Sequence, residues 1–131
     1  MTAPAIALLL LAAPNAHART IVTLPNTSIS STTRVDDYSL NPASSLIAHG
    51  AITNQIVMSG AGLTAEAGSR TLDIDARQQS TVVIDGSQVT ARSMINQAIL
   101  VTGNSSLLVT NNSTVTNSTG WGVSVTRTTG E

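Results

Sequence analysis

Hydrophobic and polar residues alternate over short stretches of this chain, a two-residue period typical of β-strands with one buried face. The alternation is clear in residues 71–75, 98–102 and 122–126, where two apolar side chains stand two positions apart. Ser, Thr, Asn and Gly separate these stretches and favour turns. The apolar residues are mostly Val, Ile and Leu, which favours strands. The sequence therefore predicts an all-β protein with short strands and many polar turns.

A longer pattern recurs at a spacing of 26 residues. Residues 54–65 (NQIVMSGAGLTA), 80–91 (STVVIDGSQVTA) and 106–117 (SLLVTNNSTVTN) carry an apolar pair, a turn residue and a second apolar position in the same order. The aligned sets are Ile56 with Val82 and Leu108, Val57 with Val83 and Val109, Gly60 with Gly86 and Asn112, and Leu63 with Val89 and Val115. Such self-similarity indicates stacked repeats.

A second set of apolar pairs lies between these copies. The pairs are Leu72 and Ile74, Ile99 and Val101, and Val123 and Val125, with Leu46 and Ala48 as a degenerate first member. Their spacing indicates coils of about 24–27 residues, none of which can bury its apolar face alone. We therefore predict a right-handed parallel β-helix, in which successive coils share one core. A β-sandwich also has short strands at regular spacing and is the second interpretation.

The alternation also predicts which side chains point inward. Val82, Ile84 and Val89 are the expected core residues of the second copy. In the third copy, the additional Asn would let Leu107 and Val109 take the inward role. Because a slip of one residue turns every side chain to the other face, the register there stays open.

The first 18 residues have the pattern of a cleaved signal peptide. Residues 5–13 form an apolar run, and Ala16-His17-Ala18 matches the small-x-small cleavage pattern. The run is too short for a membrane span, which needs about 20 apolar residues. We expect residues 19–45 to form an irregular capping segment, and residues 46–131 to form the β-helix repeats.

Composition narrows the function classes. The chain has no Cys, so no disulfide framework holds it together. An exported chain without Cys fits bacterial secretion better than a small extracellular animal domain. Six basic and seven acidic residues nearly balance. Without a basic patch to bind phosphates, nucleic acid is not an expected partner.

Three segments resemble autotransporter passengers of the pertactin and adhesin type. They are STVVIDGSQVT (80–90), NSTVT (112–116) and GWGVSV (120–125), within a resemblance that covers residues 51–126. The resemblance implies an N-terminal signal, export through the inner membrane, a β-helical passenger at the cell surface or secreted, and a C-terminal outer-membrane β-barrel as its own partner. It also implies a non-enzymatic stalk or adhesin that contacts a host-cell or matrix ligand. The barrel is absent, which indicates an N-terminal fragment.

Candidate chemistry is sparse. His49 is the only histidine after residue 18, and a base without partners within reach is a poor catalyst. Asp73 and Asp75 stand two apart and would share one face, while Asp85 lies at the next turn. Carboxylate pairs on a β-helix suit polysaccharide cleavage, and oxygen ligands suit calcium. The simpler interpretation is that Asp73 and Asp75 are the polar half of an alternation and that Asp85 is a turn residue.

Arginines lie near these acids, at Arg70, Arg77 and Arg92, but they are not spaced to bind a uronate. We therefore predict no catalytic, cofactor or metal residue. The alternatives that stay open are a β-helical polysaccharide lyase or hydrolase and a self-associating secreted structural module.

Asparagines and the single Trp complete the candidates. Five asparagines begin N-x-Ser/Thr triplets: Asn26, Asn104, Asn111, Asn112 and Asn117. We interpret them as corner residues that bond their neighbours, rather than as glycosylation sites. Trp121 stands between two glycines, where a packed corner or cap is favoured over a ligand-stacking role.

Overall fold

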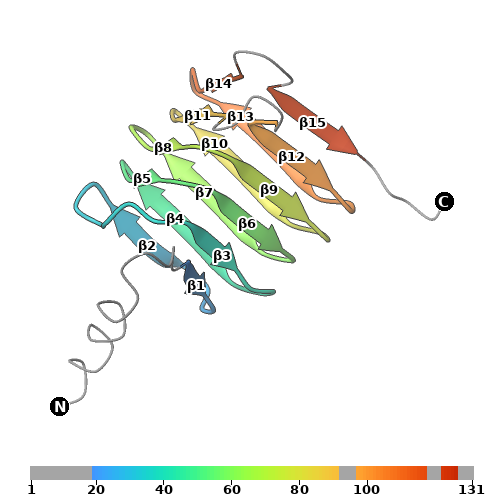
Figure 1. The fold of residues 1–131 in the computed structure, drawn as a ribbon, viewed down its shortest axis with the longest axis horizontal. Coiled ribbons are helices and arrows are strands. Elements are labelled where there is room, and N and C mark those ends of the chain that lie inside the picture. Colours follow the sequence, from blue (N-terminus) through green and yellow to red (C-terminus); the bar gives the residue numbers. More distant parts are fainter. Residues whose placement is uncertain (1–18, 92–96, 118–121, 127–131) are drawn as a thin grey trace.

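The computed structural model describes residues 19–91, 97–117 and 122–126. These residues form 15 strands and no helix. Figure 1 shows the strands stacked along one axis in chain order, from the blue end to the red end. The predicted signal peptide and Trp121 lie outside the described residues.

The strands belong to three sheets, which we call A, B and C. Sheet A has β1 (Thr20–Val22), β3 (Tyr38–Leu40), β6 (Ile56–Ser59), β9 (Ile74–Arg77), β12 (Ile99–Thr102) and β15 (Val123–Thr126). Sheet B has β2 (Thr27–Ser30), β4 (Ser45–His49), β7 (Gly62–Glu66), β10 (Thr81–Asp85) and β13 (Ser106–Thr110). Sheet C has β5 (Ile52–Thr53), β8 (Arg70–Thr71), β11 (Gln88–Thr90) and β14 (Thr114–Thr116).

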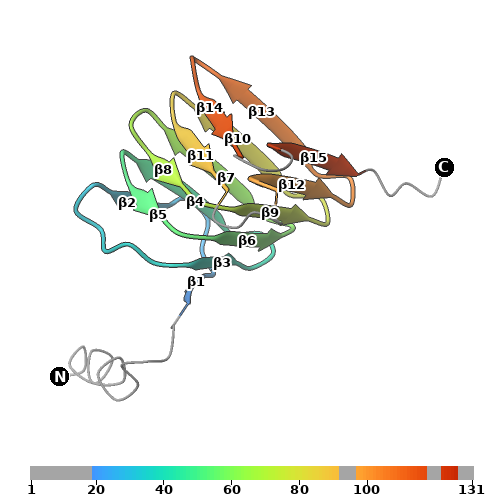
Figure 2. The same ribbon diagram turned by 45° about the horizontal axis from the view of Figure 1, so that its top comes forward.

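From β3 onward the chain passes through sheets A, B and C in turn and then returns to sheet A one level further along (Figure 2). All strand pairs in the three sheets are parallel. Each circuit is therefore one coil of a solenoid. The predicted all-β fold with stacked parallel coils is confirmed at this level.

The predicted coil length is wrong for the first coils. Ile56 lies beside Ile74, only 18 positions further along the chain, and Leu63 lies beside Val82. The alignment of residues 54–65 with 80–91 at a spacing of 26 therefore does not correspond to stacked positions. The alternation is the same in both segments, so periodicity alone could not separate the two frames.

Later coils are longer and follow the sequence prediction more closely. Val89 lies beside Val115 and Ile99 beside Val123, as predicted. Val82 lies beside Leu107, one residue away from the predicted Leu108. The added length lies at the corner between sheets C and A. There β11 and β12 are joined by residues 91–98, whereas two residues join β8 to β9.

The sequence suggested an irregular segment over residues 19–45, but the structure has regular strands there. These residues contain β1, β2 and β3, which pair with each other or with the next coil. Pro25 and Pro42 lie in the turns that follow β1 and β3, where no ladder hydrogen bond is lost. Ile29 and Tyr38 are buried, so this segment belongs to the stack.

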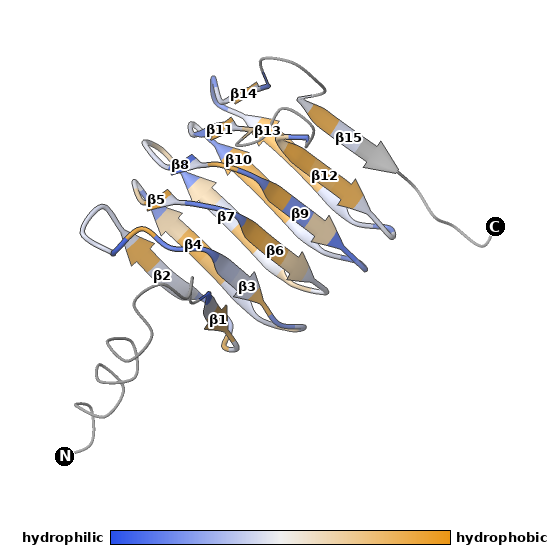
Figure 3. Ribbon diagram, viewed as in Figure 1, coloured by the Kyte–Doolittle hydropathy of each residue, from blue (hydrophilic) through white to orange (hydrophobic). Residues whose placement is uncertain are grey.

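The core runs through the middle of the coils. The predicted core residues Val82, Ile84 and Val89 are each fully buried, which confirms that register. Leu107 and Val109 lie beside Val82 and Ile84, so the second of the two registers left open for the third copy is the one observed. Hydrophobic residues fall mainly on the strands and hydrophilic residues mainly at the connecting turns (Figure 3).

Alternation does not extend from β9 back to the preceding corner. Ile74 and Ala76 point inward on β9, while Leu72 lies in the corner and is half-buried. Leu46 and Ala48 lie beside Leu63 and Ala65 rather than beside Leu72 and Ile74. The described part of the chain contains no candidate for a membrane-spanning helix.

Candidate functional site

The candidate site lies at the corner between sheets A and B. Continuing the register of β6, β9 and β12 by one residue places Gly60, Gln78 and Gly103 in one row. All three adopt the left-handed backbone conformation, with φ of 62°, 54° and 63°. A glutamine therefore lies between two glycines in a row of equivalent turns.

These turns line a depression that is open to solvent and has a volume of about 450 Å³. Its walls come from three successive coils and from the turn before β4. The contributing residues are Pro42, Ser59, Gly60, Gln78, Gln79, Gly103 and Asn104. Every one of these residues is uncharged at neutral pH, and four of them carry an amide or hydroxyl group.

The turns of this corner lie close together at the two glycines. A Cβ added to Gly103 would lie 2.8 Å from the backbone nitrogen of Gln78, which is closer than real contacts allow. A Cβ added to Gly60 would lie 3.6 Å from the Gln78 carbonyl oxygen. The successive turns therefore approach each other so closely that a side chain at Gly103 would force them apart.

Hydrogen bonds fix the polar groups of this corner. The Ser59 hydroxyl donates to Oε1 of Gln78 at 2.6 Å, and the Gln79 backbone N–H donates to the Gly103 carbonyl at 2.8 Å. The side chains of Gln79 and Asn104 are exposed to solvent. Gln78 is thus held by its neighbour, whereas the next row presents two outward amides.

A ladder of serines behind the turns holds the corner together. The Ser80 hydroxyl accepts a 3.3 Å hydrogen bond from the Ala61 N–H and donates to the Arg77 carbonyl at 2.7 Å. The Ser105 hydroxyl accepts from the Ser80 N–H at 2.9 Å in the same way. Buried backbone N–H and C=O groups need hydrogen-bond partners, and the sheets do not supply them all at these tight turns. The serine hydroxyls supply the missing partners and so stabilise the turns.

The three candidate carboxylates do not share one face. Asp73 precedes β9 and is only 3% exposed in the corner between sheets C and A. Asp75 points outward from sheet A and is held by Arg77, with hydrogen bonds of 2.9 and 2.7 Å. Asp85 ends β10 in sheet B and accepts from the Asn111 amide at 2.5 Å.

The expectation that Asp73 and Asp75 form one outward pair is therefore wrong. The strand begins at Ile74, and the bend of the chain before it directs Asp73 inward. Within the described residues, no three His, Asp or Glu side chains are grouped to hold a metal ion.

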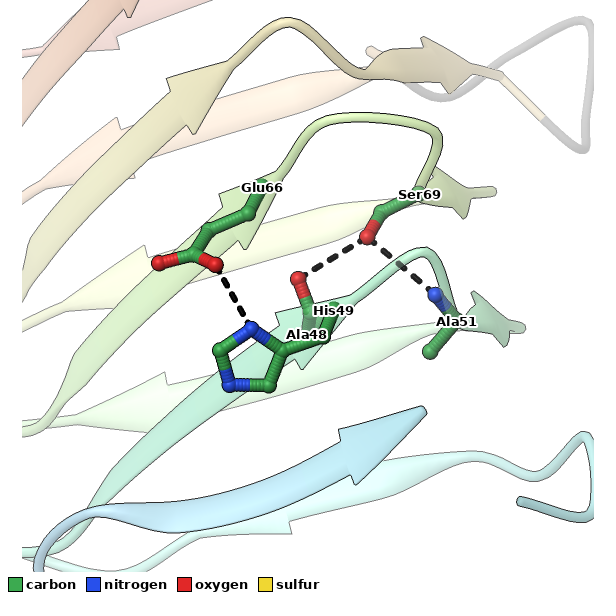
Figure 4. Close-up of polar contacts among 5 residues, drawn as sticks. All are labelled: Ala48, His49, Ala51, Glu66 and Ser69. Carbon is green, nitrogen blue, oxygen red and sulfur yellow. Dashed lines mark hydrogen bonds and ion pairs between the residues drawn. The ribbon is translucent and has the colours of Figure 1, made fainter. Parts of the chain in front are cut away.

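His49 has a partner that sequence reasoning did not foresee. Its Nδ1 lies 2.6 Å from Oε1 of Glu66, which is its neighbour across β4 and β7 (Figure 4). Both side chains are about half exposed, at 50% and 43%. This pair joins two neighbouring coils on the outside of sheet B.

The expected corner role agrees with the structure for four of the five asparagines. Asn26, Asn104, Asn111 and Asn112 all have positive φ, a conformation that Asn tolerates better than most residues. Gly86 and Asn112 share the corner between sheets B and C, as predicted. Gly60 does not, because it lies at the corner between sheets A and B.

Sequence reasoning missed the Gln78–Gln79 turn. The available signal was a pair of glutamines before Ser80, at a place where the neighbouring coils use Gly60 or Gly103. That comparison needs the 18-residue frame, which the 26-residue alignment hid.

Comparisons of this chain with protein-family models, with curated proteins and with solved structures found no match. The site must therefore be interpreted from its own geometry.

Proposed function

We propose that this chain is a non-enzymatic, exported segment of a bacterial autotransporter-like passenger, which acts as an extracellular stalk or adhesive surface. In this proposal residues 1–18 are the cleaved signal, and the parallel crossovers are right-handed, as nearly all such connections are. The proposed partner is a host-cell or matrix surface ligand.

One observation carries the proposal. A stack of parallel coils presents uncharged hydrogen-bonding side chains around the depression at the corner between sheets A and B. Residues on rigid strands and tight turns lose little conformational entropy on binding, which favours recognition.

A polysaccharide lyase or hydrolase is less well supported. General acid and base catalysis needs two carboxylates that flank one bond. Asp75 and Asp85 lie on different sheets, and each is held by a neighbouring side chain. Asp73 is buried beneath the surface.

A self-associating structural module is favoured by a separate observation. Among the described residues, the large hydrophobic side chains that are exposed all lie on the first or last strands and turns of the three sheets. They are Ile21, Leu24, Val35, Ile52, Leu108 and Val109. Open strand edges with apolar neighbours promote association.

A binding and turnover assay on the exported chain separates these three functions. We expect saturable retention on host cells or on a matrix-coated surface, with no release of reducing ends from polysaccharides. Polysaccharide cleavage that Asp75→Asn abolishes would show the enzyme instead. Concentration-dependent fibres without retention would show the structural module and would contradict an adhesive role.

A further inference from the structure

We propose that the depression at the corner between sheets A and B binds a neutral, linear glycan. This inference rests on the proposed adhesive function and names the ligand class for it. Four lines of observation lead to it: the charge of the lining, its hydrogen-bonding chemistry, the spacing of the turns and the backbone conformation of Gln78.

The charge of the lining selects a neutral ligand. None of the residues around the depression carries a charge at neutral pH. The nearest cation along the chain is Arg77, and Asp75 holds its guanidinium through two hydrogen bonds. A sulfated or uronic-acid glycan would find no free cation here. No ion pair would therefore offset the free-energy cost of desolvating its charge.

The polar groups match sugar hydroxyls. Side-chain amides both donate and accept hydrogen bonds, and so do the vicinal hydroxyls of a sugar ring. Gln78 accepts from Ser59 through Oε1, which leaves its NH₂ group to donate. Gln79 and Asn104 add two exposed amides, while the ring of Pro42 supplies an apolar contact for a sugar face.

The repeat of the turns favours an elongated ligand. Neighbouring strands in a sheet lie about 4.8 Å apart, so equivalent turns recur at that interval along the stack. This interval is close to the length of one sugar ring. A linear glycan that lies along the stack would therefore meet an amide of one coil and then an amide of the next.

The backbone conformation shows that glutamine is not the easiest residue here. A non-glycine residue in the left-handed conformation is strained, and both Gln78 and Gln79 have positive φ. The coils on either side use Gly60 and Gly103 in the row of Gln78, which avoids this strain. Strain that is retained where glycine would relieve it is typical of functional positions.

Glycine at these positions should remove binding without harming the fold, because it relieves the backbone strain and removes the side-chain amide. We would titrate the ¹⁵N-labelled full chain with neutral hexasaccharides of β-1,4-linked glucose, α-1,4-linked glucose and β-1,4-linked N-acetylglucosamine. The side-chain amide signals of Gln79 and Asn104 report directly on the site. A hexasaccharide of galacturonate is the charged comparison.

We expect at least one neutral hexasaccharide to shift these signals at millimolar concentration, independently of salt. Gln79→Gly should weaken binding about tenfold, which is the effect of one or two lost hydrogen bonds, with an equal or higher melting temperature. The matched control is Gln88→Ala, because Gln88 is an exposed glutamine on β11 of sheet C. That variant should bind as tightly as the original chain.

The proposal is overturned if no neutral hexasaccharide shifts the two amides, if galacturonate binds more tightly, or if Gln79→Gly binds as well as the original chain. Retention on cells by Gln79→Gly at the original level would show that the glycan inference fails while adhesion stands. Glycan binding without retention on cells would show that the glycan site exists but that the chain is not an adhesin.

Discussion

The hydroxyl of Thr53 donates a 2.9 Å hydrogen bond to the hydroxyl of Thr71, and both side chains are buried inside the stack. The two residues are neighbours across β5 and β8. The next two strands of the same sheet place Val89 and Val115 in that inward row. The interior of sheet C therefore changes from a polar pair to an apolar pair while the shape of the side chains is kept.

This pair should behave as a unit. Thr71→Val removes the acceptor of the Thr53 hydroxyl and should lower the free energy of unfolding by about 1–3 kcal/mol, because a buried hydroxyl loses its partner. Replacing both residues by Val should restore stability to within about 1 kcal/mol of the original chain. Chemical denaturation of the two single variants and the double variant measures this coupling. Additive losses would contradict it.

Buried and exposed polar contacts that lie side by side should differ in strength. The Ser69 hydroxyl accepts from the Ala51 N–H at 3.2 Å and donates to the Ala48 carbonyl at 2.9 Å, and it is 1% exposed (Figure 4). Ser69→Ala should therefore lower the free energy of unfolding by about 1–3 kcal/mol.

Glu66→Gln is the matched comparison, because Glu66 contacts His49 in the same two coils but at the surface. Solvent screens such a pair, so its loss should change the free energy of unfolding by less than about 1 kcal/mol. Chemical denaturation of both variants decides the order. A larger loss for Glu66→Gln would show that the buried serine is not what holds this corner.

Because the turns lie so close together, we expect two glycines to differ in how strongly alanine destabilises the fold. Gly68 and Gly103 both have positive φ, so alanine at either position should lower the free energy of unfolding by about 1–2 kcal/mol. At Gly103 the added Cβ also meets the Gln78 nitrogen at 2.8 Å, whereas at Gly68 its nearest neighbour is at 3.7 Å. Gly103→Ala should therefore be the more destabilising variant in thermal melts. Equal melting temperatures would contradict the geometry of this corner.

Alkaline pH should weaken the fold through Tyr38. Burial raises the pKa of its hydroxyl above the ordinary value near 10, and the Asp36 carboxylate raises this pKa further. Because the folded state holds the proton more tightly, its contribution to stability is complete below pH 10 and is lost as the pH rises through the higher folded pKa.

The chain contains no Lys and one Tyr, so few other groups titrate in this range. Absorbance of the ionised phenol near 295 nm, followed with circular dichroism, should show ionisation above pH 10 together with a loss of stability. Tyr38→Phe should remove that loss. Ionisation at pH 10 in the native state would contradict the burial of Tyr38.

Local alternation was enough to predict an all-β protein and much of its core. Val82, Ile84 and Val89 were identified because their period of two residues is a local property of a strand. The stacking of Val89 on Val115, and of Ile99 on Val123, was also predicted, since those coils have nearly equal lengths.

Coil length in the first half of the chain could not be obtained in this way. Ile56 and Val82 both point inward, so a spacing of 26 satisfies the alternation as well as the true stacking of Ile56 on Ile74 does. The difference depends on how many residues the corner connections contain. No pattern in the sequence marks where a connection ends.

The candidate site was missed for the same reason. Gln78 attracts attention only when Gly60 and Gly103 are known to occupy the same row, and this requires the correct stacking of three coils. The position of Asp73 also depends on a corner, which turns its side chain inward where simple alternation predicted an outward one.

The most direct test of this account is the stacking that forms the row of Gly60, Gln78 and Gly103. The chain contains no Cys, so a pair of introduced cysteines would report one contact only.

Ser59 and Arg77 are direct neighbours across β6 and β9, and adjacent strands lie within the Cα separation that a disulfide needs. The matched control joins Ser59 to Asp85, the positions that a 26-residue repeat would stack. We expect mild oxidation to link Ser59→Cys with Arg77→Cys completely and to leave the Ser59→Cys and Asp85→Cys pair as free thiols. A disulfide in the second pair but not in the first would contradict the 18-residue coil and the site built upon it.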